Sequence, residues 1–280
     1  MMRSTSFHRL LMCALAFVAN QATALVPPAP KLPADAYFLM DATTGQVLVN
    51  HNGDLSLPPA SLTKIMTSYV LAEEVDAGRA SLDDMIKVSR NAWSQNPIFN
   101  GSSLMWIEPG KPVSLADLER GVVISSGNDA SVAVAEHLAA TESSFVDVMN
   151  QLAAELGLDN TVYRNPHGLP HPEHRTTARD LATLSVALIN GHPEHYKIYK
   201  EQSFTYNGIK QYNRNSLLRS DATVDGLKTG YTSEAGYGLV ASAQREDMRL
   251  VSVVLGSASE GTRAAAVSYT HLTLPTTTIV

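Results

Sequence analysis

A serine and a lysine one helical turn apart are the residues of this chain best placed to do chemistry together. Ser61 is followed three positions later by Lys64, and no other serine has lysine at that spacing. Positions i and i+3 share a helix face, so the amine can reach the hydroxyl. A serine hydroxyl becomes a good nucleophile when a neighbouring base takes its proton, and desolvation or nearby cations favour the neutral lysine that this requires. The pair predicts serine acyl transfer without a histidine–aspartate relay.

The residues around the pair predict that it opens a helix. Pro58 and Pro59 end an extended segment, and apolar residues follow at helical spacing from Ile65 to Leu71. Backbone N–H groups near a helix N-terminus point at any negative charge that develops there. A Ser-x-x-Lys taken alone is equally well read as an ordinary helix start.

A second motif, Ser126-Gly127-Asn128, lies at a predicted junction between two helices. In such a loop both polar side chains can face one cleft, with Ser126 relaying a proton and Asn128 binding a substrate amide. Taken alone, the pair is better explained as helix caps, because serine and asparagine favour such positions.

The third motif, Lys228-Thr229-Gly230, lies at a predicted strand entry. Lys228 would supply a fixed positive charge and Thr229 a hydroxyl donor for a carboxylate, while Gly230 would let a substrate backbone approach closely. The alternative for this motif is a lysine in a surface turn. The occurrence of all three motifs in order, on suitable elements, favours a single site.

The elements that must hold these motifs follow an α+β pattern. Strands are expected within residues 37–50, around a turn at Thr44-Gly45, and again at 226–228, 238–243 and 250–256, with a hairpin break at 244–248. Helices are expected between them, starting near Ser61, after Ser114, at Asn128, after Ser143 or Ser144, and at Thr177. Strands at both ends and helices in the middle predict an antiparallel sheet with an inserted helical cluster.

Six segments together resemble a known family. They are Pro59-Ala60-Ser61-Leu62-Thr63-Lys64, Ser125-Ser126-Gly127-Asn128-Asp129-Ala130, Asp225-Gly226-Leu227-Lys228-Thr229-Gly230, Asn165-Pro166-His167-Gly168-Leu169, Arg214-Asn215 and Ala235-Gly236-Tyr237. Over residues 35–265 the chain resembles the low-molecular-mass penicillin-binding proteins that are serine D-alanyl-D-alanine carboxypeptidases, of the peptidase S11 type, and the Ser-x-x-Lys and Lys-Thr-Gly motifs are typical of penicillin-binding proteins. The resemblance implies a β-lactamase/transpeptidase-like fold.

The resemblance also implies a mechanism and a set of roles. Ser61 would attack the carbonyl between the two terminal D-alanines of a peptidoglycan stem peptide, and penicillins would acylate the same hydroxyl. Backbone N–H groups would form the oxyanion hole. No cofactor and no metal are implied. The implied roles are proton acceptance by Lys64, proton transfer to the leaving amine by Ser126, oxyanion binding by Ser61 and Tyr231, and carboxylate binding by Lys228 and Thr229 with support from Arg214.

Three alternatives stay open. A class A β-lactamase would carry a glutamate that activates the deacylating water, yet Asn165-Pro166-His167-Gly168 stands where Glu-x-x-Leu-Asn is expected. A metal-binding module is suggested by His167, His171, Glu173 and His174, although intervening prolines favour a solvated, bent surface loop. The third alternative is an inactive fragment that binds the cell wall.

The N-terminus reads as a secretory signal. Residues 1–24 have a basic start, a short apolar run and an Ala22-Thr23-Ala24 cleavage site. Their removal takes away the only cysteine and lowers the cationic residues from 21 to 19 against 27 acidic ones, a net charge of −8. Such a chain is unsuited to electrostatic binding of nucleic acid. The expected location is the periplasm, at the outer face of the inner membrane for full-length relatives.

The C-terminal end changes character. Residues 25–265 are expected to form the penicillin-binding domain, and 266–280 a non-native tail with neither helical periodicity nor strand alternation, an edge strand being the alternative. The family resemblance stops near Ala265. The expectation is a C-terminally truncated chain that lacks the family's membrane anchor.

Overall fold

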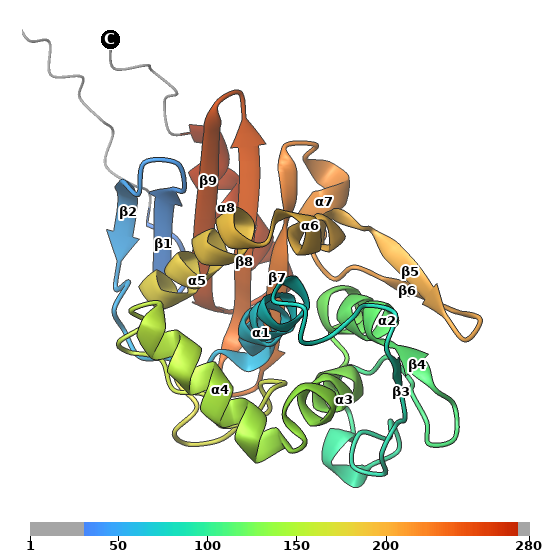
Figure 1. Ribbon diagram of the computed structural model, residues 1–280. Helices are drawn as coiled ribbons and strands as arrows, with labels where there is room; N and C mark the ends of the chain where they lie inside the picture. The colour runs from blue at the N-terminus through green and yellow to red at the C-terminus, as the bar shows by residue number, and fades with distance from the viewer. Residues whose placement is uncertain (1–30, 274–280) are drawn as a thin grey trace, which may run out of the picture.

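The structure is a computed structural model that describes residues 31–273, with side chains to residue 268. The predicted signal segment, residues 1–24, and residues 274–280 lie outside the described residues. One central sheet and a helical cluster beside it make up the molecule (Figure 1).

The central sheet joins the two ends of the described chain. Its five strands run in the order β2-β1-β9-β8-β7, and all neighbours are antiparallel. Because β1 pairs with β9, the first hairpin and the last strands form one sheet, and the helices between them are an insertion. This confirms the predicted topology. The strands are β1 (Ala36–Asp41), β2 (Val47–His51), β7 (Val224–Thr232), β8 (Gly236–Arg245) and β9 (Met248–Ser257).

Helices and two small hairpins complete the described elements. The α-helices are α1 (Lys64–Asp76), α2 (Leu115–Arg120), α3 (Asn128–Ala139), α4 (Glu142–Glu155), α5 (Ala178–Gly191), α6 (Pro193–Tyr196), α7 (Leu217–Ser220) and α8 (Glu260–Thr273). The short 3-10 helices are η1 (Ala60–Thr63), η2 (Pro97–Phe99) and η4 (Lys197–Lys200), and η3 (Gly121–Ser125) is a short π-helix. The hairpin strands are β3 (Met85–Ile86) with β4 (Val113–Ser114), and β5 (Ser203–Tyr206) with β6 (Ile209–Tyr212).

Both faces of the central sheet are buried. Side chains alternate across a strand, and in β8 Val240 packs with the helical cluster whereas Leu239 and Ala241 pack on the opposite face with Val267 of α8. Helices α5 and α8 accordingly lie on opposite sides of the sheet (Figure 1). Because β7 is the edge strand on the side of α1, its polar motif lies beside the start of that helix.

Capping hydroxyls set two helix starts, those of α2 and α5, where they were expected. The hydroxyl of Ser114 accepts a hydrogen bond from the backbone of Asp117, and that of Thr177 does the same with Asp180. The predicted cap at Ser143 or Ser144 was wrong. Thr141 caps α4 by accepting from the Ser144 N–H, since its extended backbone points the hydroxyl at the first turn.

Two further features differ from expectation. The β5–β6 hairpin was not predicted, although Asn207-Gly208 between alternating residues is a strong hairpin signal and both residues have positive φ. Helix α8 continues to Thr273, so the edge strand considered as the alternative for the tail is wrong that far. No break in secondary structure falls at residue 266, and Ala266 and Val267 pack against the sheet.

Among the helices between residues 31 and 273, none is both long enough and apolar enough to cross a bilayer.

Candidate active site

Ser61 and Lys64 sit at the turn where η1 passes into α1. The lysine is fully buried, and its Nζ lies 3.3 Å from the Ser61 Oγ. The same amine donates to the Asn128 Oδ1 and to the backbone carbonyl of His167, each at 2.6 Å. A neutral amine has two N–H groups, so these acceptors can occupy both and leave the lone pair for the Ser61 hydroxyl.

The electrostatic surroundings favour that neutral form. Burial lowers the pKa of Lys64 to about 7; the negative charge of Asp129 opposes this shift, and the positive charge of Arg214 adds to it. Desolvation disfavours a charged group, which is why burial is the largest cause. At neutral pH a substantial part of the population therefore carries a Lys64 able to accept a proton.

The loop at residues 165–169 fixes the start of α1. Ala60 has a φ of 50°, and a side chain on Gly168 would place its Cβ 1.9 Å from the Ala60 carbonyl oxygen. Thr67 donates to the Pro166 carbonyl at 2.6 Å. Only a glycine allows such a close approach, so this loop sets the backbone just before Ser61.

Ser126 and Asn128 are placed by a sharp turn between η3 and α3. Ser126 ends η3 with a left-handed φ of 61°, and Asn128 begins the next helix. Gly127 between them has no room for a side chain, because a Cβ would lie 2.8 Å from Asp129 and 3.0 Å from the Met105 nitrogen. Both polar side chains are buried, and Asn128 contacts Lys64.

Asp129 is a structural residue of the site that the sequence interpretation missed. Its fully buried carboxylate accepts hydrogen bonds from the backbone N–H groups of Met105, Trp106 and Ile107 at 2.8, 2.8 and 3.2 Å. It thereby fastens the 105–107 segment beside the Ser126 turn. An acidic residue in the first turn of a helix is commonly explained by the helix dipole, and that local explanation hides the long-range role.

Lys228 links the edge strand to this turn. It is 2% exposed, and its Nζ donates to the Ser126 Oγ at 2.9 Å and to the Thr229 carbonyl at 3.1 Å. Burial holds the pKa of Lys228 well below its usual value, and the charges of Lys64, Arg214 and Arg263 lower it further. The fixed positive charge expected from the sequence is therefore disfavoured until an anion approaches.

The remaining predicted residues surround Lys228. Thr229 is 6% exposed, and Arg214 donates to the Ser125 carbonyl at 3.2 Å. Gly230 is required by the protein's own packing, because a Cβ there would lie 3.1 Å from the Pro59 carbonyl oxygen. Tyr231 follows with a half-exposed side chain that lies against Tyr237, ring centroids 4.3 Å apart.

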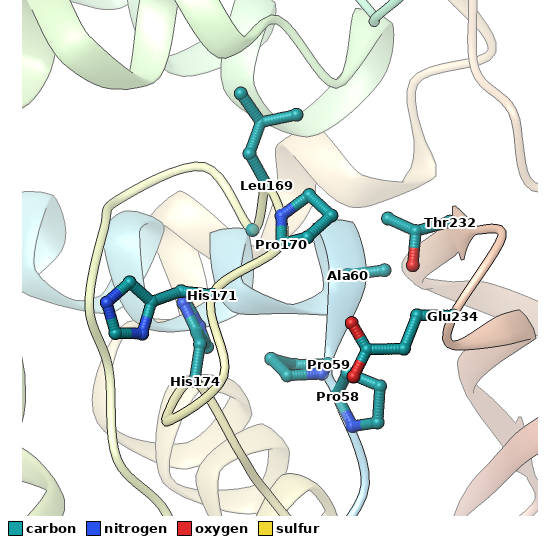
Figure 2. A pocket seen from close by; sticks show the side chains of 10 residues that line it. Pro58, Pro59, Ala60, Leu169, Pro170, His171, His174, Thr232 and Glu234 are labelled. Carbon is teal, nitrogen blue, oxygen red and sulfur yellow. The ribbon is translucent and has the colours of Figure 1, made fainter.

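A small recess borders η1 at Ala60 and the two prolines before it. Figure 2 shows the loop that carries Pro170 and His174 on one side, Glu234 on the other, and Ala60 between them. Arg175 forms an ion pair with Glu234 at 3.0 Å next to this recess.

The four-residue cluster that suggested a metal is divided between the interior and the surface. His167 and His174 are buried, which contradicts the solvated loop expected, whereas His171 and Glu173 are exposed. His174 instead contacts the Thr63 hydroxyl at 2.9 Å. Over residues 31–273 no group of three or more histidine, cysteine or acidic side chains is arranged to hold a metal ion.

The fold and this polar cluster match solved penicillin-binding proteins. Penicillin-binding protein 5 from Haemophilus influenzae superposes with a TM-score of 0.83 at 45% identity, covering 85% of this chain and 70% of that one. Penicillin-binding protein 6B from Escherichia coli gives 0.82 at 46% identity, covering 86% and 78%. The fold is thus that of the penicillin-binding proteins, as the resemblance implied.

The chain belongs to the D-alanyl-D-alanine carboxypeptidase family, peptidase S11, whose profile matches residues 21–259. Among curated relatives, D-alanyl-D-alanine carboxypeptidase DacC of Escherichia coli K12 is 50% identical over 250 residues, which are 89% of this chain and 62% of DacC. DacA of the same strain is 46% identical, over 83% of this chain and 58% of DacA. The chain spans about three-fifths of the length of these relatives.

Proposed function

We propose that this chain is a serine D-alanyl-D-alanine carboxypeptidase that removes the terminal D-alanine of peptidoglycan stem peptides. The observation that carries the proposal is the fully buried Lys64, with a pKa of about 7 and its Nζ 3.3 Å from the Ser61 Oγ. A base with a pKa near the working pH is what general-base catalysis requires. Membership of the carboxypeptidase family supports the choice of substrate.

In the proposed reaction, neutral Lys64 takes the Ser61 proton as the Oγ attacks the carbonyl carbon between the two D-alanines. The backbone N–H groups of Ser61 and Tyr231 bind the resulting oxyanion. The carbon–nitrogen bond then breaks, the leaving amine takes a proton through Ser126, and an ester on Ser61 remains. Water hydrolyses that ester, which releases the shortened peptide and restores the serine hydroxyl.

The substrate's terminal carboxylate is assigned to the cationic end of the site. Lys228, Thr229 and Arg214 would hold it, and Asn128 would bind a peptide amide. An anion there would compensate the mutual repulsion of the buried cations around Lys228. Gly230 contributes by letting β7 pack closely on η1.

β-Lactams are proposed to act as covalent inhibitors that acylate Ser61. Penicillin-binding protein D2 of Listeria monocytogenes, 30% identical with a TM-score of 0.78, is known in a cefotaxime-bound form. Its ampicillin-bound form is also known. These structures support β-lactam binding by a related fold.

The proposed division is a signal segment over 1–24 followed by the catalytic domain from residue 25, with export to the periplasm; the boundary expected after residue 265 is not kept, because Ala266 and Val267 of α8 pack against the sheet. Expression in a bacterium followed by N-terminal sequencing of the exported protein tests the first boundary. Cleavage after Ala24 would give a mature protein beginning at Leu25. A mature chain that still begins at Met1 would overturn it.

The activity is tested by incubating the purified protein with benzylpenicillin and recording intact mass over time, beside a Ser61→Ala variant. A persistent one-to-one adduct only in the wild type, with D-alanine release from a peptide ending in D-Ala-D-Ala, is expected. A short-lived adduct with rapid drug hydrolysis would identify a β-lactamase instead. Absence of any adduct on protein with a cooperative thermal transition would overturn the acyl-serine assignment.

A further inference from the structure

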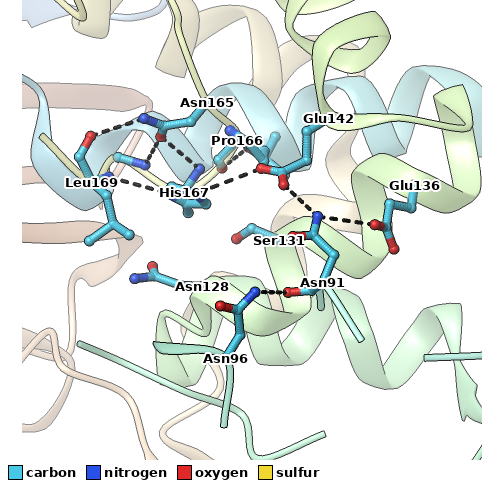
Figure 3. Close-up of polar contacts among 12 residues, drawn as sticks. Asn91, Asn96, Asn128, Ser131, Glu136, Glu142, Asn165, Pro166, His167 and Leu169 are labelled. Atoms are coloured by element: carbon cyan, nitrogen blue, oxygen red, sulfur yellow. Dashed lines mark hydrogen bonds and ion pairs between the residues drawn. The ribbon is translucent and has the colours of Figure 1, made fainter. Parts of the chain in front are cut away.

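A polar network behind Lys64 has no part in the reaction steps given above. Figure 3 shows Asn91, Glu142 and His167 in a row that leads from the loop before η2 to the 165–169 loop. Asn128, which contacts Lys64, lies in the same view. The network therefore reaches the proposed general base through Asn128 and the His167 carbonyl, both of which accept hydrogen bonds from Lys64.

The hydrogen bonds of the His167 ring define which ring nitrogen carries the proton. It is 4% exposed, and its Nδ1 accepts a hydrogen bond from the Leu169 N–H at 3.1 Å. Burial lowers the pKa of His167 well below its usual value, with further lowering by Lys64 and His174, so the ring is neutral. With Nδ1 as acceptor, the ring proton is on Nε2, and Nε2 faces the Glu142 carboxylate at 3.7 Å.

The imidazole ring and the backbone carbonyl of His167 belong to a loop that is held by several internal hydrogen bonds. The Asn165 Oδ1 accepts from the Gly168 N–H at 2.6 Å, and its Nδ2 donates to the Leu169 carbonyl at 2.9 Å. The His167 carbonyl then accepts from the Lys64 Nζ at 2.6 Å. A rotation of the ring would break its bond to Leu169 and disturb the peptide unit that holds the lysine.

Glu142 is itself held in place. It is the first residue of α4, and its Oε1 accepts from the Asn91 Nδ2 at 2.7 Å. The Asn91 carbonyl accepts from Asn96 at 2.9 Å. Glu136 shares the Asn91 amide at 3.2 Å. At 3.7 Å the contact between Glu142 and His167 is electrostatic rather than a full hydrogen bond, so it orients the ring without locking it.

We propose that Glu142 is a positioning residue of this site, which keeps the Nε2–H of His167 turned toward itself and so holds the His167 carbonyl against Lys64. With that carbonyl fixed, one N–H of the neutral amine is occupied and the lone pair faces Ser61. The inference rests on the proposed acylation of Ser61 and adds a residue that never touches the substrate.

Two substitutions separate this role from a purely structural one. Glu142→Gln removes the charge that attracts the ring N–H but keeps an oxygen for Asn91. His167→Asn keeps an acceptor near the Leu169 N–H but lacks the atom that faces Glu142. Glu136→Gln is the matched control, because Glu136 shares the Asn91 contact and has no contact with His167.

The experiment measures the second-order rate of Ser61 acylation by benzylpenicillin, the steady-state constants on a D-Ala-D-Ala peptide, and melting temperature. Glu142→Gln and His167→Asn are each expected to slow acylation about tenfold, as modest misplacement of a catalytic group does. The loss should fall on kcat with KM unchanged, and the double variant should be no slower than His167→Asn alone. The acylation rate of Glu136→Gln should stay within about twofold of the wild-type rate, because surface substitutions away from buried contacts usually have small effects.

The outcomes are distinct. A wild type that benzylpenicillin does not acylate would overturn the proposed function. A wild type that is acylated, beside a Glu142→Gln variant that reacts equally fast, would overturn the positioning role, even if that variant melts at a lower temperature as a mere α4 helix-start role would predict. Additive losses in the double variant would also overturn it, because they would show that Glu142 does not act through His167.

Discussion

Two buried lysines in one cluster of cations define the chemistry at the scale of single residues. Lys64 and Lys228 each contact one serine of the site, Ser61 and Ser126 respectively. Burial lowers the pKa of both amines, and each lysine lies near the positive charge of Arg214. The same physical effect thus suits one amine to the proton-accepting role proposed for it and the other to the proposed binding of an anion.

The rate of acylation should follow the protonation of Lys64. A base must be neutral, so the second-order rate with a penicillin is expected to rise with pH through a midpoint near 7. A stopped-flow or fluorescent-penicillin assay from acid to mildly alkaline pH measures it. Lys64→Arg, which stays protonated, should slow acylation by about 10²–10⁴-fold. A flat profile across neutrality would contradict Lys64 as the base.

Binding of a carboxylate ligand should take up a proton. The pKa of Lys228 is depressed in the free protein, and an adjacent carboxylate favours the charged amine, so affinity should fall as pH rises. Calorimetry with a D-Ala-D-Ala peptide and Ser61→Ala, in buffers of different ionisation enthalpy, counts the protons. Lys228→Gln should abolish the uptake. Unchanged proton uptake in that variant would assign the effect to another group.

At the scale of elements, close approaches of backbone hold the motifs together. The 165–169 loop touches η1 at Ala60, and β7 touches η1 at Gly230. The segment before Ser61 is therefore fixed from both sides by glycines on elements that lie far away in the chain. Asp129 fastens the 105–107 segment at the third side of the site.

Gly168→Ala should test the first of these contacts. Its φ of 88° predicts backbone strain, and the Cβ that alanine adds would clash with the Ala60 carbonyl oxygen. Gly157→Ala is the matched control, with a φ of 70° and open space around it. The control should cost about 1–2 kcal/mol of the free energy of unfolding, and Gly168→Ala a further ~1–3 kcal/mol. Only Gly168→Ala should slow acylation; equal effects of both in denaturant melts and penicillin binding would contradict the contact's role.

At the scale of the whole molecule, a second titratable cluster lies at the other end of α1. His192 contacts Glu73 and Asp76 near the C-terminal end of α1, and His195 contacts the buried Glu119 of α2. Burial lowers the pKa of His195, but the Glu119 hydrogen bond and the charges of Glu119, Asp76 and Glu194 outweigh it, so the net shift is upward. The cluster joins α1, α2 and the segment that begins α6.

This cluster should make stability depend on pH on the alkaline side. The pKa of His195 in the folded protein is raised above its unfolded value of 6.5. The protonated ring therefore stabilises the fold fully below pH 6.5, and this stabilisation is lost as pH rises through the folded-state pKa. The depressed pKa values of Lys64 and Lys228 act in the opposite direction, because the unfolded chain binds more protons at those two amines as pH rises above 7. The His195 contribution is therefore measured as a difference: in urea unfolding, the stability advantage of the wild type over Glu119→Gln should shrink as pH rises above 6.5. A difference that does not change with pH would remove the cluster from the explanation.

Local physics explains what the sequence predicted by itself. The i, i+3 spacing of Ser61 and Lys64, the caps at Ser114 and Thr177 and the short, β-rich runs of the late strands all depend on neighbours a few residues away. Such local features can be predicted from the sequence before the fold is known. The missed β5–β6 hairpin belongs with them, because Asn207-Gly208 carried the signal.

Only the tertiary structure decided what those residues can do. The acceptors that orient Lys64 come from Asn128 and His167, which are 64 and 103 positions away, and the depressed pKa values arise from burial by the whole helical cluster and the sheet. The roles of Asp129 and Glu142 likewise depend on distant partners. Desolvation and long-range charge are properties of the packed molecule rather than of a motif, and so spacing predicted the reaction class while packing set the proton affinities.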